Sequence, residues 1–174
     1  MHEPEGFSEF VAARSGALVR SAWLLTGDQG LAEDLVQTAL AKTWVRWRRV
    51  ERKDAPEAYV RRVMLTQFLT WNRRLSRRSE LPVSALPDIG EAGDAFGDVE
   101  LRTAVRTALR ALPPRQRAVV VLRYFDDLTE AQTAAVLGCT VGTVKSQNAK
   151  AMKTLRTHPH ISRLWDEEAS REPG

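Results

Sequence analysis

Apolar residues recur three and four positions apart through most of the chain, which is the spacing of one face of an α-helix. No stretch shows the regular apolar–polar alternation of a half-buried strand. Turn-forming residues interrupt the helical pattern at Gly27-Asp28, along residues 79–98, and at Gly138. The pattern therefore predicts an all-α fold.

The segment from Thr129 to Leu155 predicts two helices separated by a short break. Thr129 is placed to cap the first helix, Gly138 to end it in the left-handed conformation, and Thr140 to cap the second. The first helix should bury a face of small residues. Its predicted members are Ala131, Ala134, Ala135 and Leu137.

The second helix of this segment predicts a buried stripe of Val144, Ala151 and Leu155, with Met152 at its edge. Asn148 falls on the stripe and needs a hydrogen-bond partner there, which the sequence does not identify. The outward positions are Thr143, Lys145, Ser146, Gln147, Ala149 and Lys150. This is the helix-turn-helix pattern, whose second helix enters a DNA major groove. The alternative is an ordinary helical hairpin with solvated lysines.

Charges are sorted along the chain more strongly than the net charge of +4 suggests. Residues 42–78 hold 12 Lys and Arg against 3 Asp and Glu, and residues 101–165 hold 11 against 3. Residues 79–100 hold 6 acidic residues and no Lys or Arg. We therefore predict two small helical domains, residues 5–78 and 99–165, joined by a flexible acidic linker at 79–98. Two basic bodies in one chain suit contact with one polyanion at two places.

The first basic block predicts a helix that carries arginines beside aromatic residues. Arg61, Arg62, Arg73 and Arg74 can attract phosphates, while aromatic faces can stack on unpaired bases. The aromatic residues concerned are Phe68 and Trp71. Such a surface suits single-stranded more than duplex DNA. The alternative is that both aromatic side chains belong to the core, which the pattern favours for Phe68 and leaves open for Trp71.

The remaining composition excludes several classes of protein. A single cysteine, Cys139, permits no internal disulfide, and three histidines make a metal centre improbable, so we expect no cofactor. Cys139 suits a buried turn better than a redox sensor. The longest aliphatic run, Ala118–Leu122, is too short to span a bilayer, and the acidic start lacks the features of a secretory signal. We expect a cytoplasmic protein without membrane insertion.

Several motifs together resemble a known family. LPPRQRAVVVLRYFDDLTEAQTAAVLGCTVGTVKSQNAKAMKTLR resembles the promoter-binding C-terminal domain of extracytoplasmic-function sigma factors, which belong to the sigma-70 family of RNA polymerase subunits. LTGDQGLAEDLVQTALAKTWVRW resembles the polymerase-binding part of the N-terminal domain, and PEAYVRRVMLTQFLTWNRRLSRR resembles its promoter-melting helix. The wording is closest to an actinobacterial SigE-like subgroup.

The resemblance implies two DNA-binding surfaces. The minus-35 element would be read as duplex by Thr143, Lys145, Ser146, Gln147, Ala149 and Lys150. The minus-10 element would be bound as single strand by Arg49, Arg52, Lys53, Arg61, Arg62, Thr66, Gln67, Thr70, Trp71, Arg73 and Arg74. Thr66 stands where relatives usually have Asn, and Thr70 stands where many have Asp. Gln147 stands where Arg is frequent in relatives. These departures put the exact base preferences in doubt.

The resemblance also implies protein partners. The residues expected to dock on the clamp helices of the largest polymerase subunit are Asp34, Leu35, Gln37, Leu40, Ala41 and Trp44. Contact with the flap region is expected as well, and an anti-sigma factor is a candidate partner. In relatives the acidic linker between the two domains can thread a basic channel of a partner protein. The alternative for residues 79–98 is a plain spacer.

Three functions can be weighed on this sequence. A sigma factor, which is not an enzyme, accounts for both halves of the chain. A stand-alone helix-turn-helix regulator accounts for residues 129–155 but leaves the first half unexplained. An enzyme acting on nucleic acid would need a catalytic cluster or a phosphate-binding glycine loop, and the sequence shows neither. We therefore expect a promoter-recognising subunit of RNA polymerase.

Overall fold

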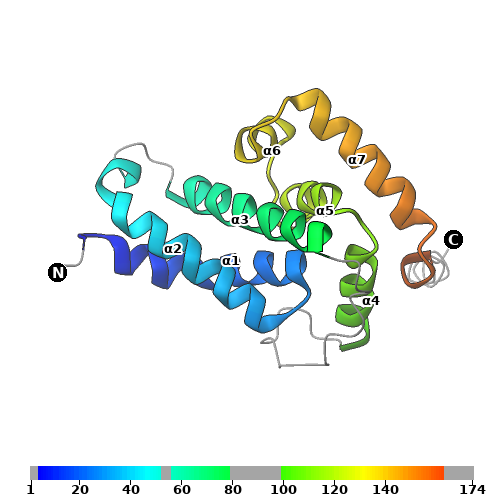
Figure 1. The fold of residues 1–174 in the computed structure, drawn as a ribbon, viewed down its shortest axis with the longest axis horizontal. Coiled ribbons are helices and arrows are strands. Elements are labelled where there is room, and N and C mark those ends of the chain that lie inside the picture. Colours follow the sequence, from blue (N-terminus) through cyan, green and yellow to red (C-terminus); the bar gives the residue numbers. More distant parts are fainter. Residues whose placement is uncertain (1–3, 52–55, 79–98, 163–174) are drawn as a thin grey trace, which may run out of the picture.

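The computed structural model describes residues 4–51, 56–78 and 99–162, and their regular structure is entirely helical. Figure 1 shows the path of the chain. The elements are α1 (Phe7–Thr26), α2 (Gln29–Glu51), α3 (Pro56–Arg78), α4 (Val99–Arg110), α5 (Pro114–Val120), the π-helix η1 (Val121–Phe125), α6 (Glu130–Leu137) and α7 (Val141–Arg156). The predicted all-α fold is confirmed for the described residues.

Helices α1 and α2 form a hairpin, and α3 packs along it (Figure 1). Gly27 ends α1 with φ 68°, and its N–H donates to the carbonyl of Trp23 at 2.7 Å. Asp28 then caps α2, because its carboxylate accepts from the backbone N–H of Leu31 at 2.8 Å. Helix α2 starts at Gln29, directly after this cap.

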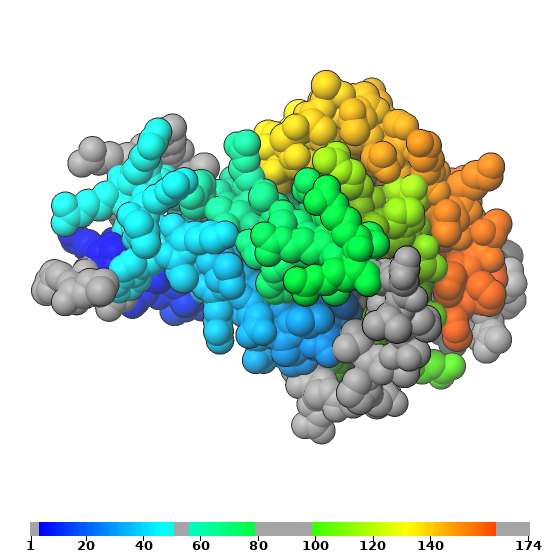
Figure 2. Space-filling view, in the orientation of Figure 1, coloured from blue at the N-terminus to red at the C-terminus, as the bar shows by residue number. Residues whose placement is uncertain are grey.

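A single hydrophobic core joins the two halves of the chain. It contains Leu18, Leu35 and Phe68 from the first half together with Leu112 and Leu122 from the second. Helix α3 contacts α5 and α6, while α1 contacts α4, α5 and η1. In Figure 2 the two halves form one continuous body. The two predicted domains thus pack against each other, whereas the predicted linker, residues 79–98, lies outside the described residues.

The run of aliphatic residues after Pro114 is buried on all sides, not on one face. All five residues of Ala118–Leu122 are at most 3% exposed. Partway along this run the α-helix widens into η1, where the N–H of Asp126 donates to the carbonyl of Val121 at 3.0 Å, five residues back. Pro114 occupies the first turn of α5, where its missing N–H leaves no hydrogen bond unmade. The sequence pattern gave no indication of the π-helix.

The capping pattern of the helix-turn-helix is confirmed. The Thr129 hydroxyl accepts from the N–H of Gln132 at 3.1 Å, and the Gln132 side chain accepts in return from the N–H of Thr129 at 2.9 Å. Gly138 ends α6 with φ 66°, in the left-handed conformation. The Thr140 hydroxyl accepts from the N–H of Thr143 at 3.1 Å and caps α7.

The predicted buried face of α6 is partly wrong. Ala131 and Ala135 are exposed, and the buried residues are Thr133, Ala134 and Val136. The reason is that this short helix contacts α3 as well as α7, so its orientation depends on two neighbours. A pattern within eight residues does not reveal the second neighbour.

Candidate nucleic-acid and polymerase interfaces

Helix α7 presents a polar side because its apolar stripe is fully used in packing. Val144 and Ala151 are 0% exposed and Leu155 is 9% exposed, while Met152 is half-buried at the edge. Val144 packs with Val119 and Ala134, and half-buried Cys139 adjoins this cluster at the turn. The predicted rotation of α7 is confirmed.

The opposite side of α7 carries the predicted duplex-reading residues. Lys145, Ser146, Ala149 and Lys150 are exposed, whereas Thr143 and Gln147 are half-buried. The hydroxyls of Thr143 and Thr140 share a hydrogen bond at 2.9 Å. Lys145 pairs with Glu130 at 3.8 Å on the surface, which contributes little stability and leaves the ammonium free to exchange partners. This side of α7 therefore combines two exposed positive charges with short polar side chains.

Asn148, for which the sequence suggested no partner, donates from Nδ2 to the hydroxyl of Tyr124 at 3.0 Å. Tyr124 belongs to η1, so this hydrogen bond connects the π-helix to the middle of α7. The side chain of Asn148 is half-buried, and its Oδ1 is buried without a protein partner. The sequence pattern did not point to Tyr124, because a contact 24 residues away leaves no periodic signal.

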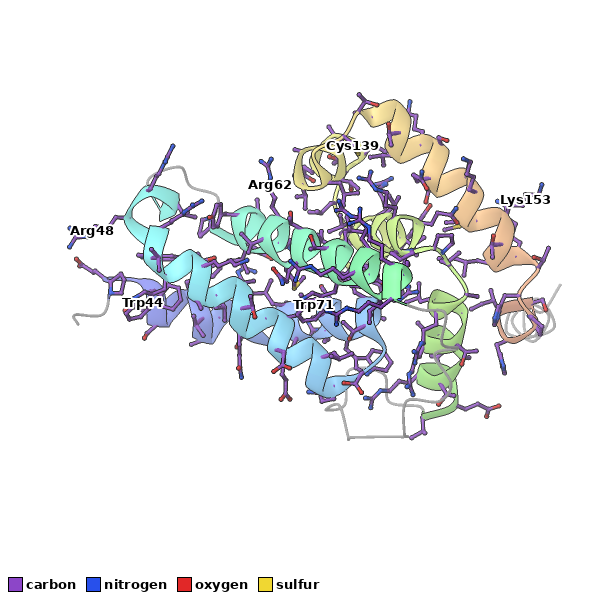
Figure 3. All side chains as sticks on the ribbon, in the orientation of Figure 1. Trp44, Arg48, Arg62, Trp71, Cys139 and Lys153 are labelled. Atoms are coloured by element: carbon purple, nitrogen blue, oxygen red, sulfur yellow. The ribbon has the colours of Figure 1, made fainter. Side chains whose placement is uncertain are left out.

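Helix α3 exposes a basic, polar face on the side away from the core. Arg62, Thr66, Arg73 and Arg74 are exposed, and Arg62 projects from the helix in Figure 3. Gln67 and Thr70 are half-buried, and the Thr70 hydroxyl donates to its own helix at the Thr66 carbonyl, 2.8 Å away.

A hollow of about 650 Å³ lies between α2 and α3 next to this face. Its polar lining is tied together by two hydrogen bonds. Lys42 donates to Gln67 at 3.1 Å, and Arg46 donates to the Tyr59 hydroxyl at 3.3 Å. The other lining residues are Val45, Arg62, Val63 and Thr66. Of the predicted residues at the neighbouring loop, Arg49 is exposed, and Arg52 and Lys53 lie outside the described residues.

The structure corrects the expectation for Arg61. Its side chain is buried, with the residue 6% exposed, and it forms ion pairs with Glu57 at 2.7 Å and with Asp126. A guanidinium in this position does not face solvent, so it is not available to a phosphate in this arrangement. Helical spacing alone did not show this, because Asp126 comes from the other half of the chain.

The two aromatic residues of α3 differ as the sequence suggested. Phe68 is 2% exposed in the core, and the Arg117 guanidinium lies 5.8 Å from the centre of its ring. Trp71 is half-buried and packs against the same core, so it retains an accessible part. Burial and the neighbouring Arg110 lower the pKa of Arg117 to about 10, which still leaves it charged at neutral pH.

Helix α2 exposes most of the predicted docking residues. Asp34, Gln37 and Ala41 are exposed, and Leu40 and Trp44 are half-buried. The ring of Trp44 meets Phe7 edge-on at 5.0 Å, as its position beside α1 in Figure 3 suggests. Leu35 is a correction: it is 0% exposed in the core, so its side chain does not form part of this surface.

Comparisons with known proteins match both halves of this arrangement. Residues 10–78 match the model of sigma-70 region 2, and residues 102–155 match that of sigma-70 region 4. The RNA polymerase sigma-E factor of Streptomyces coelicolor is 40% identical over 158 residues, covering 90% of this chain and 87% of that protein. The chain belongs to the extracytoplasmic-function sigma factors of the sigma-70 family.

Further relatives and solved structures agree with this family. The sigma-E factor of Streptomyces avermitilis is 40% identical over 152 residues, which cover 86% of this chain and 83% of that one. The sigma factor RpoE from Bartonella quintana, solved in complex with the anti-sigma factor NepR, superposes with a TM-score of 0.73. It is 24% identical, and the match covers 88% of this chain and 96% of that chain, so it supports the fold.

Membership of this family establishes the general function. The protein is an alternative sigma factor, which binds core RNA polymerase and promoter DNA and directs transcription initiation. Sigma factors are non-enzymatic regulators of transcription. A stand-alone helix-turn-helix regulator would not carry the region 2 match over residues 10–78, so that alternative is set aside. Within residues 4–51, 56–78 and 99–162, no helix is long and apolar enough to cross a bilayer.

Proposed function

We propose that three surfaces of this sigma factor divide the work of initiation. The outward side of α7 reads the minus-35 element, the exposed face of α3 and the adjoining hollow bind the minus-10 element, and α2 docks on the clamp helices of polymerase. The observation that supports this division is that the three surfaces lie on different helices, each held by a buried apolar stripe of its own.

Readout at the minus-35 element follows from the chemistry of α7. Exposed Lys145 and Lys150 suit phosphates, which position a protein without reading sequence. Ser146, Gln147 and the methyl group of Thr143 suit base edges in a major groove. Ala149 is exposed and small, so it permits close approach of the helix to the duplex.

The minus-10 element is proposed to bind as single strand. A base can be read on all its edges once it has left the stack. The hollow between α2 and α3 offers the Tyr59 ring for stacking and the side chains of Lys42, Gln67 and Arg62 for hydrogen bonds. Thr66, Thr70, Trp71, Arg73 and Arg74 continue the strand path along α3.

The polymerase contact is proposed for Asp34, Gln37, Ala41 and Trp44, with the edge of Leu40. An exposed carboxylate and amide beside a partly open indole is a mixture that protein interfaces favour. We also propose contact of the second region with the polymerase flap, and action in the cytoplasm, where this family's polymerase works.

Run-off transcription with core polymerase tests the polymerase contact. Asp34→Arg and Gln37→Ala should each reduce promoter-specific transcript and weaken competition for core enzyme, by roughly tenfold for the charge reversal. Duplex binding at the minus-35 element should stay unchanged. The matched control is Glu9→Arg, an exposed charge reversal on α1. Undiminished competition by both α2 variants would refute the assignment.

An anti-sigma factor is proposed as a further partner. One structurally similar sigma factor, RpoE from Bartonella quintana, was solved in complex with the anti-sigma factor NepR. Another structurally similar protein, CnrH, was solved in complex with the cytosolic domain of CnrY. A candidate partner should abolish run-off transcription when added in equal amount, and excess sigma factor should restore it. A protein that binds without changing transcription would not meet this definition.

A further inference from the structure

A cluster of charged and polar groups lies inside the contact between the two sigma regions. Arg61 of α3 forms an ion pair with Asp126, which follows η1, and another with Glu57 at 2.7 Å. Ser21 of α1 donates to the Asp126 carboxylate at 2.6 Å and accepts from Arg61 at 3.4 Å. Three segments that are distant in sequence therefore meet at one ion pair.

The carboxylate is the costly member of this pair. The side chains of Arg61 and Asp126 are both 7% exposed. Burial raises the pKa of Asp126 above its usual range, although Arg61 and the Ser21 hydroxyl act in the opposite direction. Arg61 also keeps a second partner in Glu57, whereas Asp126 has no other cation among the contacts described for it. Arg61 is therefore the group that makes burial of Asp126 tolerable.

The other contacts between the regions are largely independent of charge in this cluster. Phe68, Leu112 and Leu122 share one apolar core. The Arg117 guanidinium donates to the carbonyl of Leu25 at the end of α1, at 2.7 Å. These contacts favour the closed arrangement whether or not Asp126 is ionised. The ion pair with Arg61 determines whether closing also buries an unpaired carboxylate.

The closed arrangement cannot place α3 and α7 on both promoter elements. The two promoter elements, minus-35 and minus-10, are by their names roughly 25 base pairs apart. This separation is about 85 Å of duplex at about 3.4 Å per pair. A compact chain of this length has a radius of gyration of about 16 Å, which corresponds to a body roughly 40 Å across. The two regions must therefore separate before both elements are bound.

We propose that Arg61, with Ser21 and Asp126, forms a latch: Arg61 keeps the free sigma factor closed by compensating the buried charge of Asp126, and the chain opens when the promoter draws the guanidinium away. The proposal rests on the assignment of α3 and α7 to two separate elements. Breaking the latch exposes Asp126 to water and releases Arg61 on the DNA-binding helix. Asp126 and the promoter phosphates then compete for the same guanidinium, which couples opening to DNA binding.

Small-angle X-ray scattering of the full chain at neutral pH tests the latch, with circular dichroism as a check on helix content. The wild type should have a radius of gyration near the compact value of about 16 Å. Arg61→Met should strand the carboxylate and lower the ratio of closed to open molecules by about a hundredfold or more. Its radius of gyration should rise by several ångströms with helix content retained. Arg62→Met, on the exposed side of the same helix, is the control and should stay compact.

Removal of the stranded charge should reverse this effect. The double variant Arg61→Met/Asp126→Leu replaces the buried pair by apolar groups and should be compact again. A wild type that is already extended, an Arg61→Met variant that stays compact, or a double variant that stays extended would each overturn the proposal. The last result would show that Arg61 acts by packing and not by charge.

A second variant covers the case in which Arg61→Met does not fold. Asp126→Lys changes a residue outside any helix and places a positive charge against Arg61, so the chain should extend. A compact Asp126→Lys protein would overturn the latch. Scattering from the free chain does not depend on promoter reading, whereas run-off transcription does, so failure of the latch and failure of the proposed function remain distinguishable.

Discussion

The two sigma regions reach a defined shape by different means. The first is made of three long helices, of 20, 23 and 23 residues, whose core includes the large aromatic residues Trp23 and Phe68. The second uses shorter helices, of 12, 7, 8 and 16 residues and a five-residue π-helix, with an aliphatic core. The long helices of the first region are positioned by their packing along one another, whereas the second region must orient the outward side of one short helix, which requires caps and turns at defined positions.

The largest effect is expected from the aromatic core of the first region. Phe68→Ala removes a ring that is 2% exposed and should lower the free energy of unfolding by about 3–5 kcal/mol. Leu75→Ala on the same helix, where Leu75 is 57% exposed, should change it by less than about 0.5 kcal/mol. Denaturant unfolding of both variants measures the contrast. Equal effects would mean that α3 is not anchored through Phe68.

The second comparison separates anchoring from readout on α7. Gln147→Ala or Ser146→Ala should relax preference at one or two base pairs, with about 1–3 kcal/mol of discrimination lost per good contact. Lys145→Ala and Lys150→Ala should weaken binding evenly across sequences and flatten its salt dependence. Binding-site selection with each variant decides the matter. If the lysine variants change the preferred sequence, the roles assigned to this face are wrong.

A smaller effect should show how far the second region depends on its caps. Thr129→Ala removes one half of a reciprocal cap at the start of α6 and should cost about 1 kcal/mol of stability. Thr154→Ala is the matched control, because its hydroxyl bonds only to the Lys150 carbonyl of its own helix. Thermal unfolding gives both values. An unchanged midpoint for Thr129→Ala would show that packing alone holds α6.

The boundary between the regions should show a pH dependence of its own. The raised pKa of Asp126 means that the folded chain binds this proton more tightly than the unfolded chain, whose value is near 3.8. The stability that the folded chain gains by binding this proton more tightly is fully present at pH below the unfolded value. It is lost as pH rises through the pKa of Asp126 in the folded chain. The groups that face Asp126 are Arg61 and Glu57 of α3 and Ser21 of α1, with Arg14 of α1 paired to Glu57.

Denaturant unfolding of the wild type and of Asp126→Asn, repeated from acid to neutral pH, measures this pH dependence of the free energy of unfolding. The wild type should lose stability relative to the Asn variant as pH rises from acid to neutral. A wild type that gains stability relative to Asp126→Asn over the same range would show that Arg61 outweighs burial.

Local features of the fold could be predicted from the sequence, and long-range ones could not. Thr129, Gly138 and Thr140 act within a few residues of themselves, so their roles in the turn follow from residue type and position. The stripe of Val144, Ala151 and Leu155 follows from helical spacing in the same way. The orientation of α6 depends on α3, far away in the sequence, and was predicted incorrectly.

The same limit applies to the candidate sites. The exposed face of α3 and the outward side of α7 agree with the predicted surfaces, and their roles remain proposals. Arg61 and Leu35 were placed on functional surfaces by spacing and family resemblance, but both side chains are buried. The partners of Arg61 and Asn148 are Asp126 and Tyr124, and neither pair could be derived from periodicity. Both pairings depend on how the chain folds back on itself.

The π-helix η1 bears on how such chains diverge. A π-turn accommodates one residue more than the α-helix it interrupts, so it is equivalent to a single insertion inside a helix. Deletion of one residue within 121–125 would close the wide turn into an ordinary α-helical one and leave the residues after it in place. An unbroken α-helix of the original length would instead rotate everything after the turn by about 100°, since an α-helix has 3.6 residues per turn. Asp126 would then leave the neighbourhood of Arg61. The wide turn, more than the identity of its residues, therefore lets a chain of this length keep the pairing of Asp126 with Arg61.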